Sequence, residues 1–205
     1  MGDVAFGFVL VGGLSQRMGE DKTRLLYRGR PMALHQAEKL SFVCGRAALV
    51  GKGTHPFPNS GYRFVDDGEE AYAPIYGVCA ALSWSPDDLN IVVAADIPRC
   101  PESFLAALLE VAEAVPAAVV VPVVGGELQT LCSVWRRSAI PALGEAILAG
   151  RLSLRGPIER LSSVIVPECE AVRMPGGRPE NFLNVNRPED YEELKKGGEA
   201  LTSRR

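Results

Sequence analysis

The chain has 205 residues, of which 47% are hydrophobic and 23% are charged, and its net charge is −3. A chain of this length and composition is expected to form a single domain, residues 1–205, with a sizeable core. No apolar run approaches the roughly 20 residues of a membrane-spanning helix, the N-terminus lacks the basic residues of a signal peptide, and no basic run with interleaved aromatics favours nucleic acid, so we expect a cytoplasmic protein without membrane or nucleic-acid contacts.

Short apolar runs alternate with segments of helical periodicity along the first half of the chain. Strands are predicted at 5–11, 47–51, 63–67 and 90–96, and helices at 31–43 and 74–84. Pro31 stands at the start of the first helix, a position that suits proline because the backbone N–H is not needed there.

The same alternation continues through the second half. Strands are predicted at 117–124, 129–135 and 182–186, and helices at 101–114, 138–148, 153–161 and 188–196, with residues 197–205 as a flexible tail. Several strands are apolar throughout, which is typical of strands covered on both faces. The pattern therefore predicts an α/β protein, a three-layer sandwich around a mostly parallel central sheet.

Glycines, acids and amides gather where the predicted strands end. These residues are Gly12 and Gly13, Asp66 and Asp67, Asp96, and Asn184 and Asn186. Because ligands of parallel sheets bind at the carboxyl ends of strands, these side chains are the first candidates for a site.

The loop after the first strand, GGLSQRMGEDK (12–22), matches neither common phosphate loop. It lacks the GxGxxG spacing of dinucleotide-binding loops, and Gly13 to Gly19 is one residue too long for the GxxxxGK[ST] loop. Its glycines would still let backbone amides approach an anion, with Arg17 and Lys22 reaching over it. We expect a phosphate site; a glycine-rich turn with surface charges is the structural alternative.

Charge is distributed unevenly along the chain. Residues 1–55 hold eight Lys/Arg and four Asp/Glu, whereas residues 66–127 hold eleven Asp/Glu and one Arg. A basic segment opposite an acidic one suits an anionic ligand with a divalent cation, although solvated surface charge would give the same counts.

Asp96 ends a buried strand, where its carboxylate would hold Mg²⁺; capping of the next helix is the alternative. Asp66 or Asp67 would contact ribose, base or metal, or simply form an exposed turn. Asn184 and Asn186 would share one side of a strand and could recognise a heterocycle, or close that strand before a turn.

Five cysteines without a CxxC pair are expected to be free thiols, and two histidines offer little for zinc or imidazole chemistry.

The chain also resembles a known family. LVGGLSQRMGEDK (10–22) is similar to the LAGGxSxRMGxDK signature of molybdenum cofactor guanylyltransferases. Further matching segments follow in the family's order: FVDD (64–67), Gly77, VVAADIP (92–98), QTLCSVWRRSAIPAL (129–143) and NFLNVNRPEDYEEL (181–194). The resemblance implies the nucleotide-diphospho-sugar transferase, or glycosyltransferase-A-like, fold.

By this resemblance, the reaction is transfer of GMP from GTP to Mo-molybdopterin, with release of pyrophosphate. The implied nucleotide-binding residues are Leu10, Val11, Gly12, Gly13, Lys22, Asp67 and Asp96, and the catalytic residues are Arg17, Lys22 and Asp96. Asp96 would bind Mg²⁺, with Mn²⁺ as an alternative. Gly77, Asn184 and Asn186 would face the molybdopterin. Transient contact with molybdenum-insertion proteins or molybdoenzymes is also implied.

The chain departs from the family pattern at four positions. Val11 replaces an alanine, Thr130 a proline, Gly51 an asparagine and Leu152 an arginine. These departures bear on the substrate more than on the reaction class. Three other functions therefore stay open: a cytidylyltransferase acting on molybdopterin or a sugar or alditol phosphate, a non-catalytic nucleotide- or cofactor-binding adaptor, and, less well supported because DIP offers one acid, a glycosyltransferase.

Overall fold

The computed structural model describes residues 5–12, 24–69 and 71–202, with side chains as far as Lys196. The strands are β1 (Ala5–Val11), β2 (Leu26–Tyr27), β3 (Arg30–Pro31), β4 (Ala47–Gly51), β5 (Arg63–Asp66), β6 (Leu89–Ala94), β7 (Val119–Val124), β8 (Glu127–Leu128), β9 (Cys132–Arg136) and β10 (Ser163–Val166). The helices are α1 (Met32–Cys44), α2 (Pro74–Trp84), α3 (Glu102–Ala114), α4 (Ile140–Leu148), α5 (Arg155–Arg160), α6 (Glu168–Ala171) and α7 (Pro188–Thr202), with short 3₁₀ turns η2 (Arg137–Ala139) and η3 (Pro179–Phe182).

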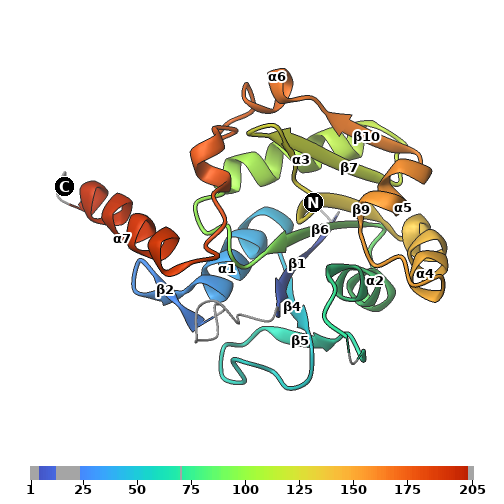
Figure 1. Ribbon diagram of the computed structural model, residues 1–205, viewed down its shortest axis with the longest axis horizontal. Coiled ribbons are helices and arrows are strands. Elements are labelled where there is room, and N and C mark those ends of the chain that lie inside the picture. The colour runs from blue at the N-terminus through green and yellow to red at the C-terminus, as the bar shows by residue number, and fades with distance from the viewer. Residues whose placement is uncertain (1–4, 13–23, 70, 203–205) are drawn as a thin grey trace.

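One sheet runs through the molecule in the order β10-β7-β9-β6-β1-β4-β5, and β8 pairs with β7 (Figure 1). Strands β6, β1, β4 and β5 are mutually parallel, as are β10 and β7. Only β9 runs antiparallel to β6 and β7 within this order. The connection from β7 to β9, residues 125–131, is too short for the dozen or so residues of a parallel crossover, so the chain turns back. The predicted mostly parallel sheet is confirmed.

Helices cover both faces of the sheet, which completes the predicted three layers. Alternate residues of β1 point to opposite faces. Val9 and Val11 pack in one core cluster with α1 and α3, whereas Phe6 and Phe8 pack in a second cluster with α2, α4 and α5. No helix in the described part of the chain is long and apolar enough to cross a membrane.

A third, smaller cluster joins the C-terminal segment to the short β2–β3 hairpin. Leu25, Tyr27 and Met32 pack against Val185 and Leu194 there. The Tyr191 hydroxyl donates a hydrogen bond to the Leu26 carbonyl oxygen at 2.9 Å. This cluster therefore ties α7 to the β2–β3 hairpin.

The predicted strand at 182–186 is wrong. Phe182 ends η3, and residues 183–186 belong to no helix or strand in the described part of the chain. Burial repeats every third residue instead of every second: Phe182 and Val185 are buried, whereas Leu183, Asn184, Asn186 and Arg187 are exposed. Val185 packs in the cluster with the hairpin, and its backbone N–H donates to the Asp96 carbonyl oxygen after β6.

The other differences concern short elements and boundaries. Strands β2, β3, β8 and β10 and helix α6 have no counterpart among the expected elements, because segments of two to four residues carry too little periodicity. Helix α7 continues to Thr202, beyond the expected start of the tail, and extends away from the sheet (Figure 1).

Gly7 sets the distance between α1 and β1. A Cβ added at Gly7 would lie 2.6 Å from the Leu40 Cβ, so Gly7→Ala forces the helix off the strand and should destabilise the protein by about 1–3 kcal/mol. In contrast, nothing lies within 4 Å of a Cβ added at Gly144 in α4, and Gly144→Ala should stabilise it by about 0.5–1 kcal/mol. Urea unfolding measures the free energy of unfolding of both variants. Equal changes in the two would contradict the close approach of α1 to β1 at Gly7.

Candidate active site

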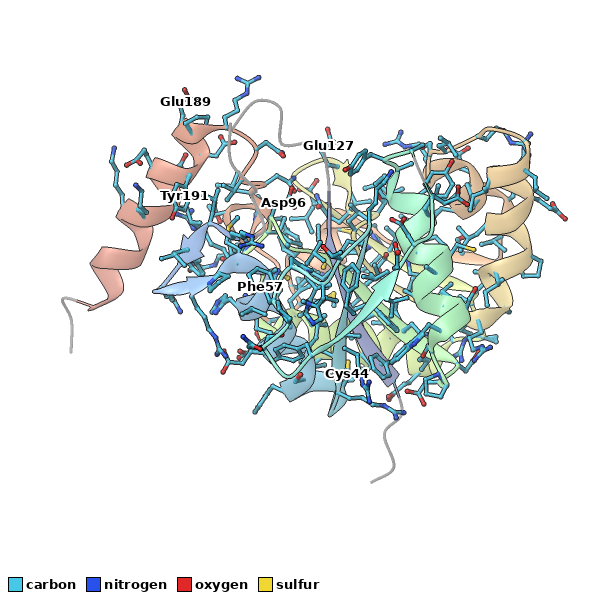
Figure 2. The ribbon with its side chains drawn as sticks, turned by 90° about the horizontal axis from the view of Figure 1, so that it is seen from below. Cys44, Phe57, Asp96, Glu127, Glu189 and Tyr191 are labelled. Atoms are coloured by element: carbon cyan, nitrogen blue, oxygen red, sulfur yellow. The ribbon has the colours of Figure 1, made fainter. Side chains whose placement is uncertain are left out.

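The carboxyl ends of four neighbouring strands form one edge of the sheet. Strand order reverses around β1, because the chain continues from β1 to β4 on one side and later returns to β6 on the other. Ala95 donates its backbone N–H to the Leu10 carbonyl oxygen (3.2 Å), and Asp67 does so to the Gly51 oxygen (2.8 Å). The structure thus brings Leu10, Asp67 and the neighbouring Asp96 to one edge, the usual ligand position in such sheets. Asp96 and Cys44, which ends α1, lie toward opposite ends of the sheet (Figure 2).

The end of β1 offers backbone rather than side chains. Val11 is 5% exposed and its side chain belongs to the core shared with α1 and α3. Gly12 has a φ of 151°, a conformation that disfavours any residue with a Cβ. Any contact of Val11 with a ligand therefore involves its main chain, and the extra methyls relative to alanine fill the core instead.

Gly77 packs against the Leu10 side chain at the end of β1. A Cβ at this position in α2 would lie 2.9 Å from the Leu10 Cδ2, so the Leu10 side chain would have to shift to admit one. Gly77 is buried, and the predicted contact with molybdopterin stays a prediction.

Gly51, which stands where the family pattern has asparagine, has a steric reason in this chain. A Cβ at Gly51 would lie 1.8 Å from the Val11 carbonyl oxygen, so no asparagine fits on this backbone. The next residue, Lys52, supplies a cation at the same strand end, with its Nζ 4.5 Å from the centre of the Tyr72 ring. The backbone nitrogen of Lys52 would lie 3.8 Å from a Cβ placed on Gly12, so this lysine starts directly beside β1.

The paired acids after β5 have different surroundings. The Asp66 carboxylate accepts hydrogen bonds from the Gly53 N–H (3.0 Å) and the Gly68 N–H (3.1 Å), and these bonds, Gly68 first, lower its pKa. Asp66 therefore fixes the turn. Asp67 is half-buried and accepts a bond from the Glu69 N–H at 3.2 Å, which leaves carboxylate capacity for a ligand.

Asp96 lies two residues beyond β6 and is half-buried. Its carbonyl oxygen accepts a hydrogen bond from the Val185 N–H at 2.9 Å, which joins the C-terminal segment to the loop after β6. Because Val185 is bonded to Asp96, its exposed neighbours Asn184 and Asn186 also lie at the Asp96 end of the sheet.

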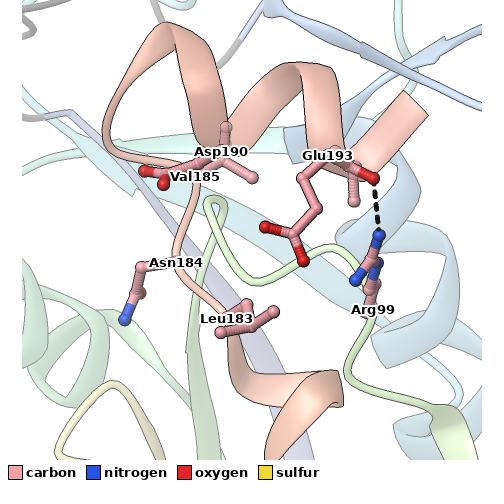
Figure 3. A pocket seen from close by; sticks show the side chains of 7 residues that line it. Arg99, Leu183, Asn184, Val185, Asp190 and Glu193 are labelled. Carbon is pink, nitrogen blue, oxygen red and sulfur yellow. Dashed lines mark hydrogen bonds between the residues drawn. The ribbon is translucent and has the colours of Figure 1, made fainter. Parts of the chain in front are cut away.

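A small pocket lies behind this segment (Figure 3). Seven residues line its volume of about 40 Å³: Arg99, Leu183, Asn184, Val185, Asp190, Glu193 and Leu194. Arg99 donates a hydrogen bond to the Glu193 carbonyl oxygen at 3.0 Å, which holds α7 near the loop after Asp96. This space is far below the roughly 300 Å³ of a typical ligand pocket, so it supports the segment and does not hold a nucleotide.

Three predicted residues, Gly13, Arg17 and Lys22, lie outside the described residues. Among the described predictions, the structure brings together Leu10, Val11, Gly12, Asp67, Asp96, Asn184 and Asn186 at one end of the sheet, with Gly77 beneath Leu10.

Comparison with known proteins agrees with this geometry. A family model described as the MobA-like NTP transferase domain matches residues 7–164. The chain belongs to this family. A probable molybdenum cofactor guanylyltransferase of Chloroflexus aggregans is 31% identical over 191 residues, 90% of each chain, and one of Pyrococcus horikoshii is 30% identical over 89% of this chain and 94% of its own.

Solved structures extend the comparison. Molybdopterin-guanine dinucleotide biosynthesis protein A from Archaeoglobus fulgidus superposes with a TM-score of 0.80 at 25% identity, covering 97% of this chain and 99% of its own. The 2-C-methyl-D-erythritol 4-phosphate cytidylyltransferase of Thermus thermophilus superposes over 96% and 98% of the two chains at 0.68 and 14% identity, which shows a shared fold alone. The resemblance and the nucleotidyltransferase fold expected from the sequence are confirmed.

Sequence reasoning missed three polar residues close to this edge: Lys52, Gln36 and Lys39. Lys52 directly follows Gly51, which drew attention only as a departure. Gln36 and Lys39 are buried on α1, on the side that carries Ala33, Ala37 and Leu40. A glutamine and a lysine within the apolar stripe of a helix were the available signal.

Lys39 predicts a distinct pH dependence of stability. Burial is the largest cause that lowers its pKa, from the usual 10.5 to about 8; Arg28 lowers it further, while Cys100, Glu102 and Cys132 raise it. The unfolded chain therefore binds this proton more tightly than the folded chain. The cost of burying the charged amine lowers stability in full below pH about 8, and stability recovers as pH rises toward about 10.5.

The comparison of wild type with Lys39→Met isolates this effect. Wild-type stability relative to the variant should rise across that pH window by an amount on the order of 3 kcal/mol. Urea unfolding at several pH values measures the difference; a difference that stays constant with pH would contradict the lowered pKa.

Proposed function

We propose that the protein is a molybdenum cofactor guanylyltransferase, which transfers GMP from GTP to Mo-molybdopterin and releases pyrophosphate. The observation that carries the proposal is the family match over residues 7–164, combined with Gly12, Asp67 and Asp96 at the same strand edge. The relatives named as guanylyltransferases align over about nine tenths of the chain, which supports the substrate assignment.

The chemistry needs positioning more than a protein nucleophile. The terminal phosphate oxygen of the pterin attacks the α-phosphorus of GTP in line. A bond forms between that oxygen and the α-phosphorus, and the bond to the oxygen bridging the α- and β-phosphates breaks, so pyrophosphate leaves. The main chain of residues 10–12 would line the guanine and ribose, and Asp67 would contact the nucleotide. The chain's two histidines and five free cysteines fit a mechanism that does not use them.

The surroundings of Asp96 fit a magnesium ion shared with the substrate. Among residues 5–12, 24–69 and 71–202, no group of three or more His, Cys, Asp or Glu could hold a metal ion. Mg²⁺ commonly binds through one or two carboxylates plus substrate phosphates, and a half-buried carboxylate at the strand end suits that mode. The ion, or Mn²⁺ in its place, supplies charge neutralisation on the triphosphate.

The remaining expected residues complete the proposal. Arg17 and Lys22 would hold the triphosphate and stabilise the charge that develops on pyrophosphate. Asn184 and Asn186 would face the pterin. Transient contact with molybdenum-insertion proteins or molybdoenzymes, in the cytoplasm, would follow from the fate of the product.

Incorporation of labelled nucleotide tests the reaction. We expect the protein to incorporate label from GTP into a pterin dinucleotide, and Asp96→Ala to lower turnover by at least about 100-fold because triphosphate charge is less well neutralised. Label from CTP in preference to GTP would make it a cytidylyltransferase. Unchanged turnover in Asp96→Ala would remove Asp96 from the chemistry.

The neighbouring acids Asp66 and Asp67 offer a matched pair. Asp67→Asn should weaken GTP binding by about tenfold, the loss expected for a hydrogen bond to a charged group, with little change in stability. Asp66→Asn should lower stability through the turn, because the amide accepts the two backbone hydrogen bonds less strongly than the carboxylate, with a smaller effect on GTP. Calorimetric titration and urea unfolding measure both; the reversed pattern would assign the nucleotide contact to Asp66.

A further inference from the structure

Two buried side chains of α1 hold the loop that follows Asp96. Gln36 donates its amide Nε2–H to the Ile97 carbonyl oxygen at 2.8 Å. Lys39, one turn further along, donates from Nζ to the carbonyl oxygens of Pro98 and Cys100, both at 2.6 Å. We call these two side chains the α1 clamp.

Burying these two polar side chains in the core costs free energy of folding. Gln36 is fully buried and Lys39 is 6% exposed. The Gln36 Oε1 has no hydrogen-bond partner among the described residues. Apolar residues of similar volume often match or exceed buried polar groups in stability. The polarity of the clamp is therefore better explained by the geometry that it imposes than by the stability it adds.

That geometry concerns Asp96. The three clamped carbonyls belong to residues 97–100, directly after Asp96, and the Asp96 carbonyl itself is bonded to the Val185 N–H. Side chains of α1 thus hold the backbone of residues 97–100, on the C-terminal side of Asp96. The C-terminal segment holds the Asp96 carbonyl group itself through Val185. Mg²⁺ accepts little deviation from octahedral geometry, so a displaced carboxylate would weaken binding.

We propose that Gln36 and Lys39 are positioning residues, which fix the loop after Asp96 so that its carboxylate meets the metal–nucleotide complex. The inference rests on the proposed function, because it takes Asp96 as the metal ligand. Neither side chain touches the substrate in this scheme; both act through the backbone of the loop. Removing them should weaken the metal by the amount typical of residues that orient a ligand, about 10- to 100-fold.

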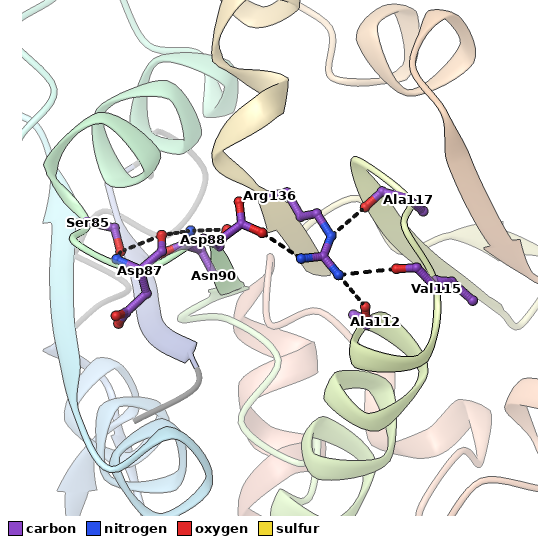
Figure 4. A network of polar contacts seen from close by, with 8 residues as sticks. All are labelled: Ser85, Asp87, Asp88, Asn90, Ala112, Val115, Ala117 and Arg136. Atoms are coloured by element: carbon purple, nitrogen blue, oxygen red, sulfur yellow. Dashed lines mark hydrogen bonds and ion pairs between the residues drawn. The ribbon is translucent and has the colours of Figure 1, made fainter. Parts of the chain in front are cut away.

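The chain provides a matched control at the other end of β6 (Figure 4). Asn90 is also fully buried, and its Nδ2 donates to the carbonyl oxygens of Asp87 and Asp88, each at 3.1 Å. The Asn90 Oδ1, like the Gln36 Oε1, lacks a hydrogen-bond partner among the described residues. The same region is braced by Arg136, whose side chain pairs with Asp88. Asn90 thus fixes the loop before β6 as the clamp fixes the loop after it.

The experiment compares Gln36→Leu, Lys39→Met and Asn90→Leu in the full chain. Binding of Mn²⁺ in the presence of GTP is measured by the electron paramagnetic resonance signal of free Mn²⁺, and stability by urea unfolding. We expect the two clamp variants to bind Mn²⁺ about 10- to 100-fold more weakly than wild type, and Asn90→Leu to bind it like wild type whatever its change in stability.

Two results would overturn the inference while leaving the proposed function intact. One is wild-type Mn²⁺ affinity in both clamp variants; the other is equal weakening in Asn90→Leu, which would indicate a general effect of stability. If Lys39→Met does not fold, Gln36→Leu alone decides between these outcomes. If the wild-type protein does not bind GTP, and does not bind Mn²⁺ in the presence of GTP, the proposed function is refuted. The inference then fails with it.

Discussion

Strand β1 packs closely against the elements on both sides of it, and this packing sets the position of the site. Three glycines contribute: Gly7 beneath α1, Gly51 beside the Val11 carbonyl oxygen, and Gly77 beneath Leu10. A Cβ would meet the Leu40 Cβ at Gly7 and the backbone at Gly51, whereas at Gly77 it would meet the end of the Leu10 side chain. Because β1 is central and its neighbours β4 and β6 are parallel to it, this approach brings Gly12, Lys52 and Asp96 to one edge. The site is a consequence of how tightly the middle of the sheet is packed.

The edge is then stabilised by groups that contribute little to the apolar core. The α1 clamp holds the loop after Asp96, Val185 binds the Asp96 carbonyl, and Arg99 ties that loop to α7. All of these contacts end on backbone carbonyl oxygens. They fix where the chain runs while leaving side chains at the strand ends available, which is the arrangement that an active site on loops requires.

The fold by itself does not select the nucleotide. The 2-C-methyl-D-erythritol 4-phosphate cytidylyltransferase of Thermus thermophilus shares the architecture at 14% identity. Here the position where the family often has asparagine must be glycine, because of the Val11 carbonyl oxygen, and the adjacent Lys52 brings a charge instead. The strand end at Gly51 and Lys52 is therefore locally altered in this chain.

The long elements, the mostly parallel sheet and the family could all be predicted from the sequence, because apolar periodicity and the motifs at 10–22 and 92–98 are local signals. The sequence also marked Asp67 and Asp96, since acids at the ends of apolar runs need no knowledge of contacts. The three-dimensional contacts were needed to see that 182–186 is no strand, that Asp66 fixes a turn, and that Gln36 and Lys39 hold the Asp96 loop. The partners of Gln36 and Lys39 lie about sixty residues away in the sequence, and a hydrogen bond between α1 and the loop after β6 leaves no trace in the local pattern of either segment.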